Sequence, residues 1–218
     1  MYKIQNLYDL GHTMAADYLC QYEYPWEALK GIKDMICALG EALDKDQFTE
    51  TAPQVWIHNT AKVAPTAYLG APCIIGAGTE VRHGAFVRGS ALVGENCVVG
   101  NSVELKNVIL FDNVQVPHYN YVGDSILGYK AHMGAGSITS NVKSDKSLVV
   151  IHCQPEIPTG IKKVGAMLGD FVEVGCNSVL NPGTVIGRNS SVYPTSCVRG
   201  VVPANSIYKK NDTIIAKH

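Results

Sequence analysis

The stretch GAFVRGSALVGENCVVGNSVELKN, residues 84–107, repeats a six-residue rhythm of aliphatic, glycine and small side chains. A period of six fits neither an α-helix nor plain strand alternation. It predicts short strands joined by tight turns, each of which points one aliphatic side chain into a coil. The rhythm extends to both sides of this stretch, with aliphatic residues at Ile57, Val63, Leu69, Ile75, Val81, Val87, Val93, Val99 and Leu105, and again at Val174, Leu180, Ile186, Val192 and Val198.

Mostly small residues stand two positions before these aliphatic residues, among them Ala85, Ala91 and Thr79. We expect them to point inward too, because bulkier side chains would clash at the corners. Cys73 and Cys97 occupy such positions and are therefore expected in the core rather than at a metal. Hexapeptide repeats of this kind predict a mainly β protein, a left-handed parallel β-helix with three repeats to a coil. The alternative is a chance alternation in a β-sandwich.

The pattern divides the chain into three predicted parts: a helical N-terminal extension (1–50), the β-helix with an inserted loop near 140–168 (51–201), and a C-terminal tail (202–218). In the extension, Pro25 favours a helix start, and a shorter helix is expected over Met14–Tyr22. We expect the apolar stripe of the main helix to pack against the coil or against a neighbouring subunit. Its members are Leu29, Ile32, Met35, Ile36, Leu39 and Leu43.

Composition narrows the classes of function. The 218 residues carry a formal net charge of −1, which does not indicate nucleic acid or an anionic membrane as a partner. Apolar runs are too short to cross a bilayer, and the N-terminus does not have the pattern of a secretory signal. The seven cysteines are odd in number and form no C-x-x-C pair, which predicts reduced thiols in a cytoplasmic protein.

Two cations interrupt the rhythm of the opening stretch. Arg88 and Lys106 are 18 residues apart, one turn of the coil, so we expect them on one face with one above the other. Two stacked cations with no acid in register repel each other unless an anion lies between them, and a phosphate accepts both. Two solvated surface cations, with Glu104 reducing the repulsion, are the alternative.

The rhythm breaks after Leu105, and its periodicity is lost between Thr139 and about Val172. Such departures concentrate at functional sites. The segment from Arg88 to Asn141 resembles the acetyltransferase domain of the bifunctional glucosamine-1-phosphate acetyltransferase/N-acetylglucosamine-1-phosphate uridyltransferases, and the C-terminal domains of archaeal sugar-1-phosphate nucleotidyltransferases. The resemblance rests on Arg88, on Val103, Glu104 and Lys106, on His118 with Tyr121–Asp124, and on Gly134–Thr139 with Asn141.

The resemblance implies a site for each substrate. His118 would be the general base; Arg88 and Lys106 would hold the sugar phosphate with help from Tyr121; Asn141 would contact the sugar. Acetyl-CoA would bind along Ala135, Gly136, Cys176 and Pro194 as a co-substrate, without a catalytic metal. Glu104 and His132 complete the predicted acceptor site. The family also implies a homotrimer with sites between adjacent subunits.

The chemistry of the residue types agrees with these roles. An amino sugar must lose a proton before its nitrogen attacks a thioester, and an imidazole, which titrates near pH 6 to 7, is suited to accept it. The oxyanion that forms next requires N–H donors, which the Gly134–Gly136 turn is expected to supply.

Departures from the family keep other functions open. His132 replaces an asparagine and Val142 replaces a tyrosine that contact the sugar in the family, and the family's loop lysine has only approximate counterparts in Lys143 and Lys146. A non-catalytic sugar-phosphate sensor or scaffold is therefore the alternative function. A γ-carbonic-anhydrase-like enzyme is a further alternative, although no histidine pair accompanies His118. The sequence contains no glycine-rich nucleotide loop, so no nucleotidyltransferase activity is expected of this chain.

Overall fold

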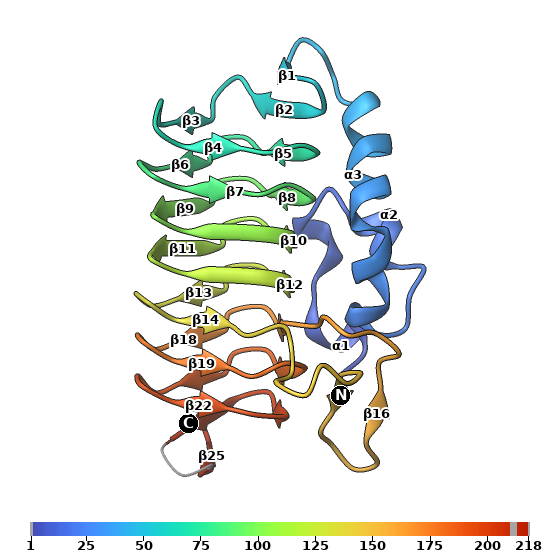
Figure 1. The fold of residues 1–218 in the computed structure, drawn as a ribbon, viewed down its shortest axis with the longest axis vertical. Helices are drawn as coiled ribbons and strands as arrows, with labels where there is room; N and C mark the ends of the chain where they lie inside the picture. The colour runs from blue at the N-terminus through green and yellow to red at the C-terminus, as the bar shows by residue number, and fades with distance from the viewer. Residues whose placement is uncertain (1, 210–212, 218) are drawn as a thin grey trace.

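A computed structural model describes residues 2–209 and 213–217 of the chain, and most of these residues form a parallel β-helix (Figure 1). Strands of successive coils pair in parallel, in a stack with three flat faces. The predicted fold class is therefore confirmed. The repeat positions explain the core: the aliphatic residues from Ile75 to Leu105 are buried, as are the small residues two positions before them.

We call the first face the site face. In each coil its strand begins directly after one of the three corners, which in the coil of β12 is formed by residues 119–120. Its strands are β4 (Tyr68–Leu69), β7 (Phe86–Val87), the first half of β10 (Glu104–Leu110), the first half of β12 (Tyr121–Leu127), β14 (Ile138–Thr139), β19 (Val179–Leu180) and β22 (Cys197–Val198).

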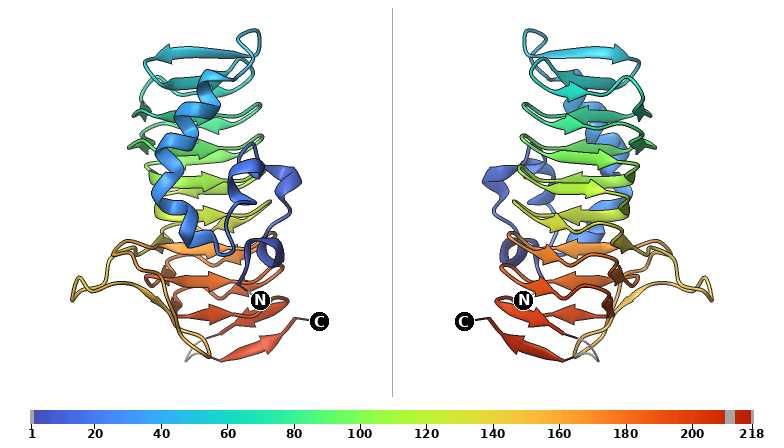
Figure 2. Two further views of the ribbon diagram at one scale, coloured as in Figure 1. Left: turned by 90° about the vertical axis from the view of Figure 1, so that its right-hand side faces the viewer. Right: turned by 90° about the vertical axis from the view of Figure 1, so that its left-hand side faces the viewer.

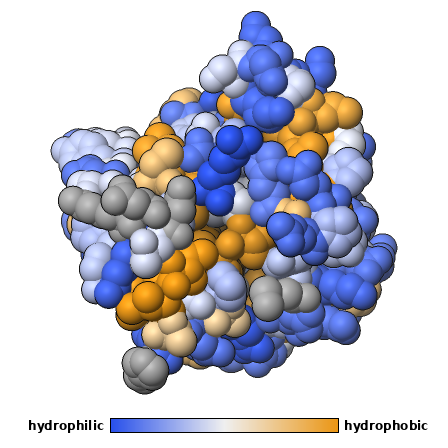
Figure 3. Space-filling model, turned by 90° about the horizontal axis from the view of Figure 1, so that it is seen from below, coloured by the Kyte–Doolittle hydropathy of each residue, from blue (hydrophilic) through white to orange (hydrophobic). Residues whose placement is uncertain are grey.

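The second face lies before that corner in each coil. Its strands are β3 (Lys62–Val63), β6 (Glu80–Val81), β9 (Val98–Asn101), β11 (Gln115–His118), β13 (His132–Met133), β18 (Glu173–Val174), β21 (Ser191–Val192) and β24 (Ser206–Tyr208). The last of these pairs antiparallel with β25 (Ile214–Ala216), so strand pairing continues past the boundary expected at residue 201. Seen from this end, the surface is mostly hydrophilic with scattered apolar areas (Figure 3).

The third face is covered by the N-terminal helices. Its strands are the second halves of β10 and β12, β2 (Val55–His58), β5 (Cys73–Ile75), β8 (Ala91–Val93), β17 (Ala166–Leu168), β20 (Thr184–Ile186) and β23 (Val201–Val202). At the N-terminal end of this face, β2 also pairs with β1 (Phe48–Ala52).

A helix of 17 residues runs along this face as η2 (Pro25–Gly31) and α3 (Ile32–Glu41) (Figure 2). The apolar stripe packs against the coil, with Leu29, Ile32 and Ile36 buried. At Gly40 a Cβ atom would lie 2.3 Å from the Trp56 ring, so this close contact requires glycine. The preceding segments are short: α1 (Ile4–Leu7), η1 (Leu10–His12) and α2 (Ala16–Leu19), the last within the longer helix expected there.

A loop leaves the coil after β14 and returns at β17. Its two ends are held together, since Val164 N–H donates to the Asn141 carbonyl at 3.1 Å and Val142 forms an antiparallel bridge with Lys163. Beyond this neck the loop forms an antiparallel hairpin, β15 (Val150–Ile151) and β16 (Ile157–Pro158), which the sequence pattern did not predict.

Candidate functional site

The candidate residues lie along two opposite edges of the site face. His118 ends β11, at the edge where the second face turns into the site face. Lys106 lies at the other edge, where the chain turns toward the helix-covered face. That turn is made by Asn107 and, one coil on, Asp124, with φ angles of 55° and 48°. Asparagine and aspartate tolerate this left-handed conformation better than most residues.

Arg88 and Lys106 lie in successive coils, as the spacing predicts, because β7 and β10 pair in parallel. Each has a carboxylate of its own. Arg88 Nη1 is 2.8 Å from Glu104 Oε1, and Lys106 Nζ is 2.8 Å from Asp124 Oδ1. The premise that no acid lies in register with these cations is therefore wrong. The role of Arg88 and Lys106 as phosphate ligands stays a prediction. A phosphate bound there would compete with the carboxylates of Glu104 and Asp124 for the two cations.

Asp124 connects most of the acceptor-side residues. Its side chain is only 4% exposed, and Oδ1 accepts from Lys106 Nζ and from Asn107 Nδ2 at 2.9 Å. Oδ2 accepts from Asn141 Nδ2, which also donates to the Tyr121 hydroxyl at 3.2 Å. We call these five residues the Asp124 network. Burial, and then the charges of Asp124 and Glu104, raise the pKa of Tyr121, so its hydroxyl keeps its proton at neutral pH.

His118 lies at a corner of the coil whose backbone is held by several hydrogen bonds. Its own N–H donates to Asn120 Oδ1 at 3.1 Å, and the buried Asn120 amide donates to the carbonyls of Gly134 at 2.8 Å and Ser137 at 3.1 Å. The imidazole is exposed and has no hydrogen-bond partner among the described residues. Both ring nitrogens are thus accessible to a ligand at this edge.

The predicted CoA-binding residues lie below His118 in the following coils. Gly136 N–H donates to the His118 carbonyl at 3.0 Å, Asn177 N–H to that of Ala135 at 2.8 Å, and Thr195 N–H to that of Cys176 at 2.8 Å. These repeated bonds place His118, Ala135, Cys176 and Pro194 in equivalent positions of successive corners. Cys176 and Pro194 are exposed. The structure therefore brings the predicted base and the predicted cofactor residues into one column, the His118 column.

The Gly134–Gly136 turn has fewer free N–H donors for an oxyanion than the sequence predicted. Gly134 N–H donates to the Val174 carbonyl at 2.7 Å, and Gly136 N–H donates to His118. In the described part of the chain only the Ala135 N–H of this turn lacks a backbone acceptor. The turn therefore offers a thioester carbonyl one N–H group.

His132 is separate from the other predicted acceptor residues. It lies on β13 of the second face, where its Nδ1 is 2.7 Å from Glu173 Oε2. Val142, at the neck of the loop, is 41% exposed. Neither residue takes part in the Asp124 network.

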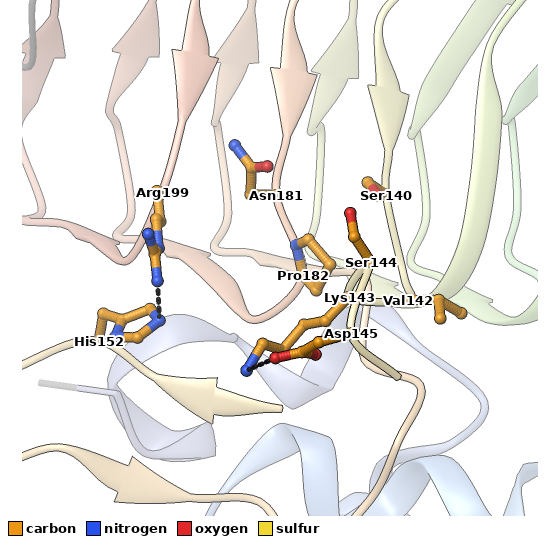
Figure 4. Close-up of a pocket in the computed structure, with 9 residues that line it drawn as sticks. All are labelled: Ser140, Val142, Lys143, Ser144, Asp145, His152, Asn181, Pro182 and Arg199. Atoms are coloured by element: carbon orange, nitrogen blue, oxygen red, sulfur yellow. Dashed lines mark hydrogen bonds and ion pairs between the residues drawn. The ribbon is translucent and has the colours of Figure 1, made fainter. Parts of the chain in front are cut away.

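A pocket of about 350 Å³ lies between the loop and the C-terminal coils (Figure 4). Both cationic side chains of the pocket already have a polar partner: Lys143 Nζ lies 3.6 Å from Asp145 Oδ2, and Arg199 Nη2 donates to His152 Nε2 at 3.0 Å. The His152 ring is in turn 2.7 Å from Glu156. The lining residues are Ser140, Val142, Lys143, Ser144, Asp145, His152, Asn181, Pro182 and Arg199.

Two structural absences concern the described residues only. No three histidine, cysteine, aspartate or glutamate side chains in residues 2–209 and 213–217 are grouped so that they could hold a metal ion. Of the helices in the same residues, none combines the length and the apolar character of a transmembrane span.

The fold and the repeat define a hexapeptide-repeat β-helix protein. Known proteins with similar sequences indicate which proteins of this class it resembles. The family described as the GMPPB C-terminal domain matches residues 79–153. The chain is similar to the bifunctional protein GlmU of Methanococcus maripaludis, with 34% identity over 115 residues, which are 52% of this chain and 28% of that protein. GlmU of Trichormus variabilis is 35% identical over 151 residues, 69% of this chain and 26% of its own length.

A third relative is the bifunctional sugar-1-phosphate nucleotidylyltransferase/acetyltransferase of Sulfurisphaera tokodaii, 31% identical over 107 residues, 49% of this chain and 27% of that protein. The resemblance inferred from residues 88–141 is therefore confirmed. The chain spans about a quarter of the length of these relatives. Among solved structures, the polySia-specific acetyltransferase NeuO matches with a TM-score of 0.48 and 14% identity, over 72% of this chain and 82% of that one.

Proposed function

We propose that this protein is an acyl-CoA-dependent N-acetyltransferase whose acceptor is a phosphorylated amino sugar. One observation carries the proposal: a single face of the coil has the Asp124 network at one edge and the His118 column at the other. The ammonium of Lys106 and the amide of Asn141 are suitable ligands for a sugar phosphate. The imidazole of His118, which has no hydrogen-bond partner among the described residues, is suitable as a general base beside a thioester bound along the His118 column.

The proposed reaction requires one base and one donor. His118 accepts the proton of the acceptor ammonium, and the freed nitrogen forms a bond to the thioester carbonyl carbon. The oxyanion accepts a hydrogen bond from the Ala135 N–H. As the carbon–sulfur bond breaks, the imidazolium of His118 donates its proton to the leaving sulfur, which departs as CoA thiol, and the nitrogen loses its second N–H proton to water. The products are an N-acetylated sugar phosphate and CoA, and no metal is needed.

The test is release of CoA thiol from acetyl-CoA over a panel of amino-sugar phosphates. For an accepted sugar, His118→Ala should lower kcat about 10²–10⁴-fold, because a general base contributes that much. CoA affinity should stay unchanged. The rate of the unmodified protein should rise with pH through an inflection that the alanine variant lacks. Equal rates for the two proteins would refute the assigned base.

A non-catalytic sugar-phosphate sensor is the second candidate, and one observation favours it. His132 is bound to Glu173 and Val142 lies outside the Asp124 network, so two positions that departed from the family pattern offer the acceptor nothing there. Thermal-shift measurements separate the candidates. Stabilisation by both CoA and a sugar phosphate supports the enzyme, whereas stabilisation by the sugar phosphate alone, with no turnover, supports the sensor.

A further inference from the structure

A second hollow shares Lys106 and Asp124 with the site described above. It has a volume of about 460 Å³ and lies at the corner between the site face and the helices, where three chain segments meet. We call it the lysine pocket. It is lined by Leu29 and Lys30 of η2, by Ser90, Lys106, Asn107 and Asp124 of the coil, and by Ile161, Lys162 and Lys163 of the returning loop.

The charges of the lysine pocket do not balance. Its single carboxylate, Asp124, already accepts from Lys106 and from two asparagine amides. Lys30, Lys162 and Lys163 are exposed and form no ion pair with any residue in the described ranges. Three uncompensated cations around one concave surface produce a positive potential, which attracts a multiply charged anion.

The backbones that carry these lysines are tied to the same corner. Asn107 Nδ2 donates both to Asp124 and to the Leu29 carbonyl at 3.2 Å, next to Lys30. On the other side, the backbone bridge between Val142 and Lys163 closes the neck of the loop beside Asn141. Thus the Asp124 network orients the acceptor site and the lysine pocket together.

We propose that the lysine pocket binds a diphosphate group carried by the acceptor, so that the acceptor is a nucleotide-linked amino sugar rather than a sugar monophosphate. This inference rests on the proposed function. Arg88 and Lys106 suffice for one phosphate, and the three further lysines provide the charge for a second one next to it. CoA also carries a diphosphate, but its predicted binding residues form the His118 column at the opposite edge of the site face.

Calorimetric titration of the full chain tests the inference without turnover. The ligands are inorganic phosphate, pyrophosphate, uridine diphosphate and CoA. Pyrophosphate and uridine diphosphate should bind at least about tenfold more tightly than phosphate, a difference of about 1.4 kcal/mol. The double variant Lys162→Ala/Lys163→Ala should remove this tenfold preference and leave CoA affinity unchanged. Lys33→Ala is the matched control, since Lys33 is an exposed lysine of α3 that does not line the pocket.

The outcomes separate this inference from the proposed function. Binding of pyrophosphate no tighter than phosphate, or unaffected by the double variant, overturns the lysine pocket as a diphosphate site. A loss of CoA binding in the double variant would assign the pocket to CoA and overturn the acceptor assignment. If acetyl transfer to a sugar monophosphate proceeds while diphosphates fail to bind, the proposed function stands and this inference falls. If diphosphates bind through these lysines but no acceptor reacts, the diphosphate site stands and catalysis falls.

Discussion

Arg88 already has a carboxylate partner, and this changes the expected behaviour of a phosphate at the site. Its ion pair with Glu104 is partly exposed, with 47% of the Arg88 side chain and 33% of the Glu104 side chain accessible, so a phosphate can displace the carboxylate at small cost. Glu104→Gln should therefore tighten binding of a phosphorylated ligand, because it removes a competing charge. Arg88→Ala should weaken the same binding by about 1.5–3 kcal/mol, the range for a charge-assisted hydrogen bond. Calorimetry with a sugar phosphate measures both. Weaker binding to the Glu104→Gln protein would instead identify Glu104 as a ligand of the sugar.

Asp124 has a second role as a structural residue at the same corner. Asp124→Asn keeps the shape and suits the positive φ, but its amide faces donors from Lys106, Asn107 and Asn141. We expect it to lower the free energy of unfolding by about 1.5–3 kcal/mol, since a buried charged acceptor is lost. Asp145→Asn is the matched control: Asp145 also pairs with a lysine, but its side chain is 63% exposed.

Urea denaturation followed by circular dichroism compares the two variants. Loss of an exposed ion pair costs about 0–1 kcal/mol, so the Asp145→Asn protein should unfold close to the unmodified protein. Equal effects of the two substitutions would contradict the structural role of Asp124. The Asp124→Asn protein should also have a raised KM for the acceptor, because Asn141 and Lys106 lose the oxygen that orients them.

The sequence predicted individual columns of residues better than the contacts between them. A six-residue period places Arg88 above Lys106 and fills the core, because each repeat forms one strand of the coil. The same 18-residue spacing separates Lys106 from Asp124 and so indicated this pair, which the expectation of two unpaired cations left out. The register differs from that of a regular coil, because β10 and β12 pair with Lys106 opposite Gly123. The shortened coil moves Asp124 onto the corner, beside Asn107.

At the scale of strands and loops, periodicity is informative only where the chain follows the coil. The break after Thr139 predicted a loop, and the chain does leave the stack between β14 and β17. Within that loop the hairpin β15–β16 and the bridge at Lys163 are antiparallel contacts outside the repeat. No period in the sequence encodes them, so Lys162 and Lys163 could not be placed beside the site.

Strand interiors provide a direct test of the repeat. Cys73 and Cys97 fill inward positions of β5 and of the coil below, and burial raises the pKa of each thiol to about 12. Both thiols should therefore stay protonated and inaccessible at pH 8. In contrast, the side chains of Cys20, Cys176 and Cys197 are exposed in the single chain. Brief treatment with iodoacetamide, followed by mass spectrometry, should find Cys20, which lies outside the site face, alkylated and Cys73 and Cys97 unmodified. Alkylation of all seven in urea is the control, and labelling of Cys73 in the native protein would contradict the assigned repeat.

The whole molecule leaves two of its three faces open, since the N-terminal helices cover the third (Figure 2). On the site face Tyr68 is 61% and Phe86 43% exposed, with ring centroids 5.6 Å apart. Exposed aromatic pairs of this kind favour burial in an interface. The resemblance implies a homotrimer, and closed threefold symmetry would bury the site face of every copy in the same way.

Light scattering at micromolar concentration should therefore give a mass near that of three copies of the 23.5 kDa chain. Tyr68→Glu should shift that mass toward a single copy, because it places a charge in the apolar contact. The fold itself should change by no more than about 0.5 kcal/mol, since exposed positions tolerate substitution. Ile214→Glu is the control: it puts the same charge on an exposed apolar residue of β25, outside the site face. A 23.5 kDa particle for the unmodified protein would contradict the trimer, and a trimer unaffected by Tyr68→Glu would assign the contact to another face.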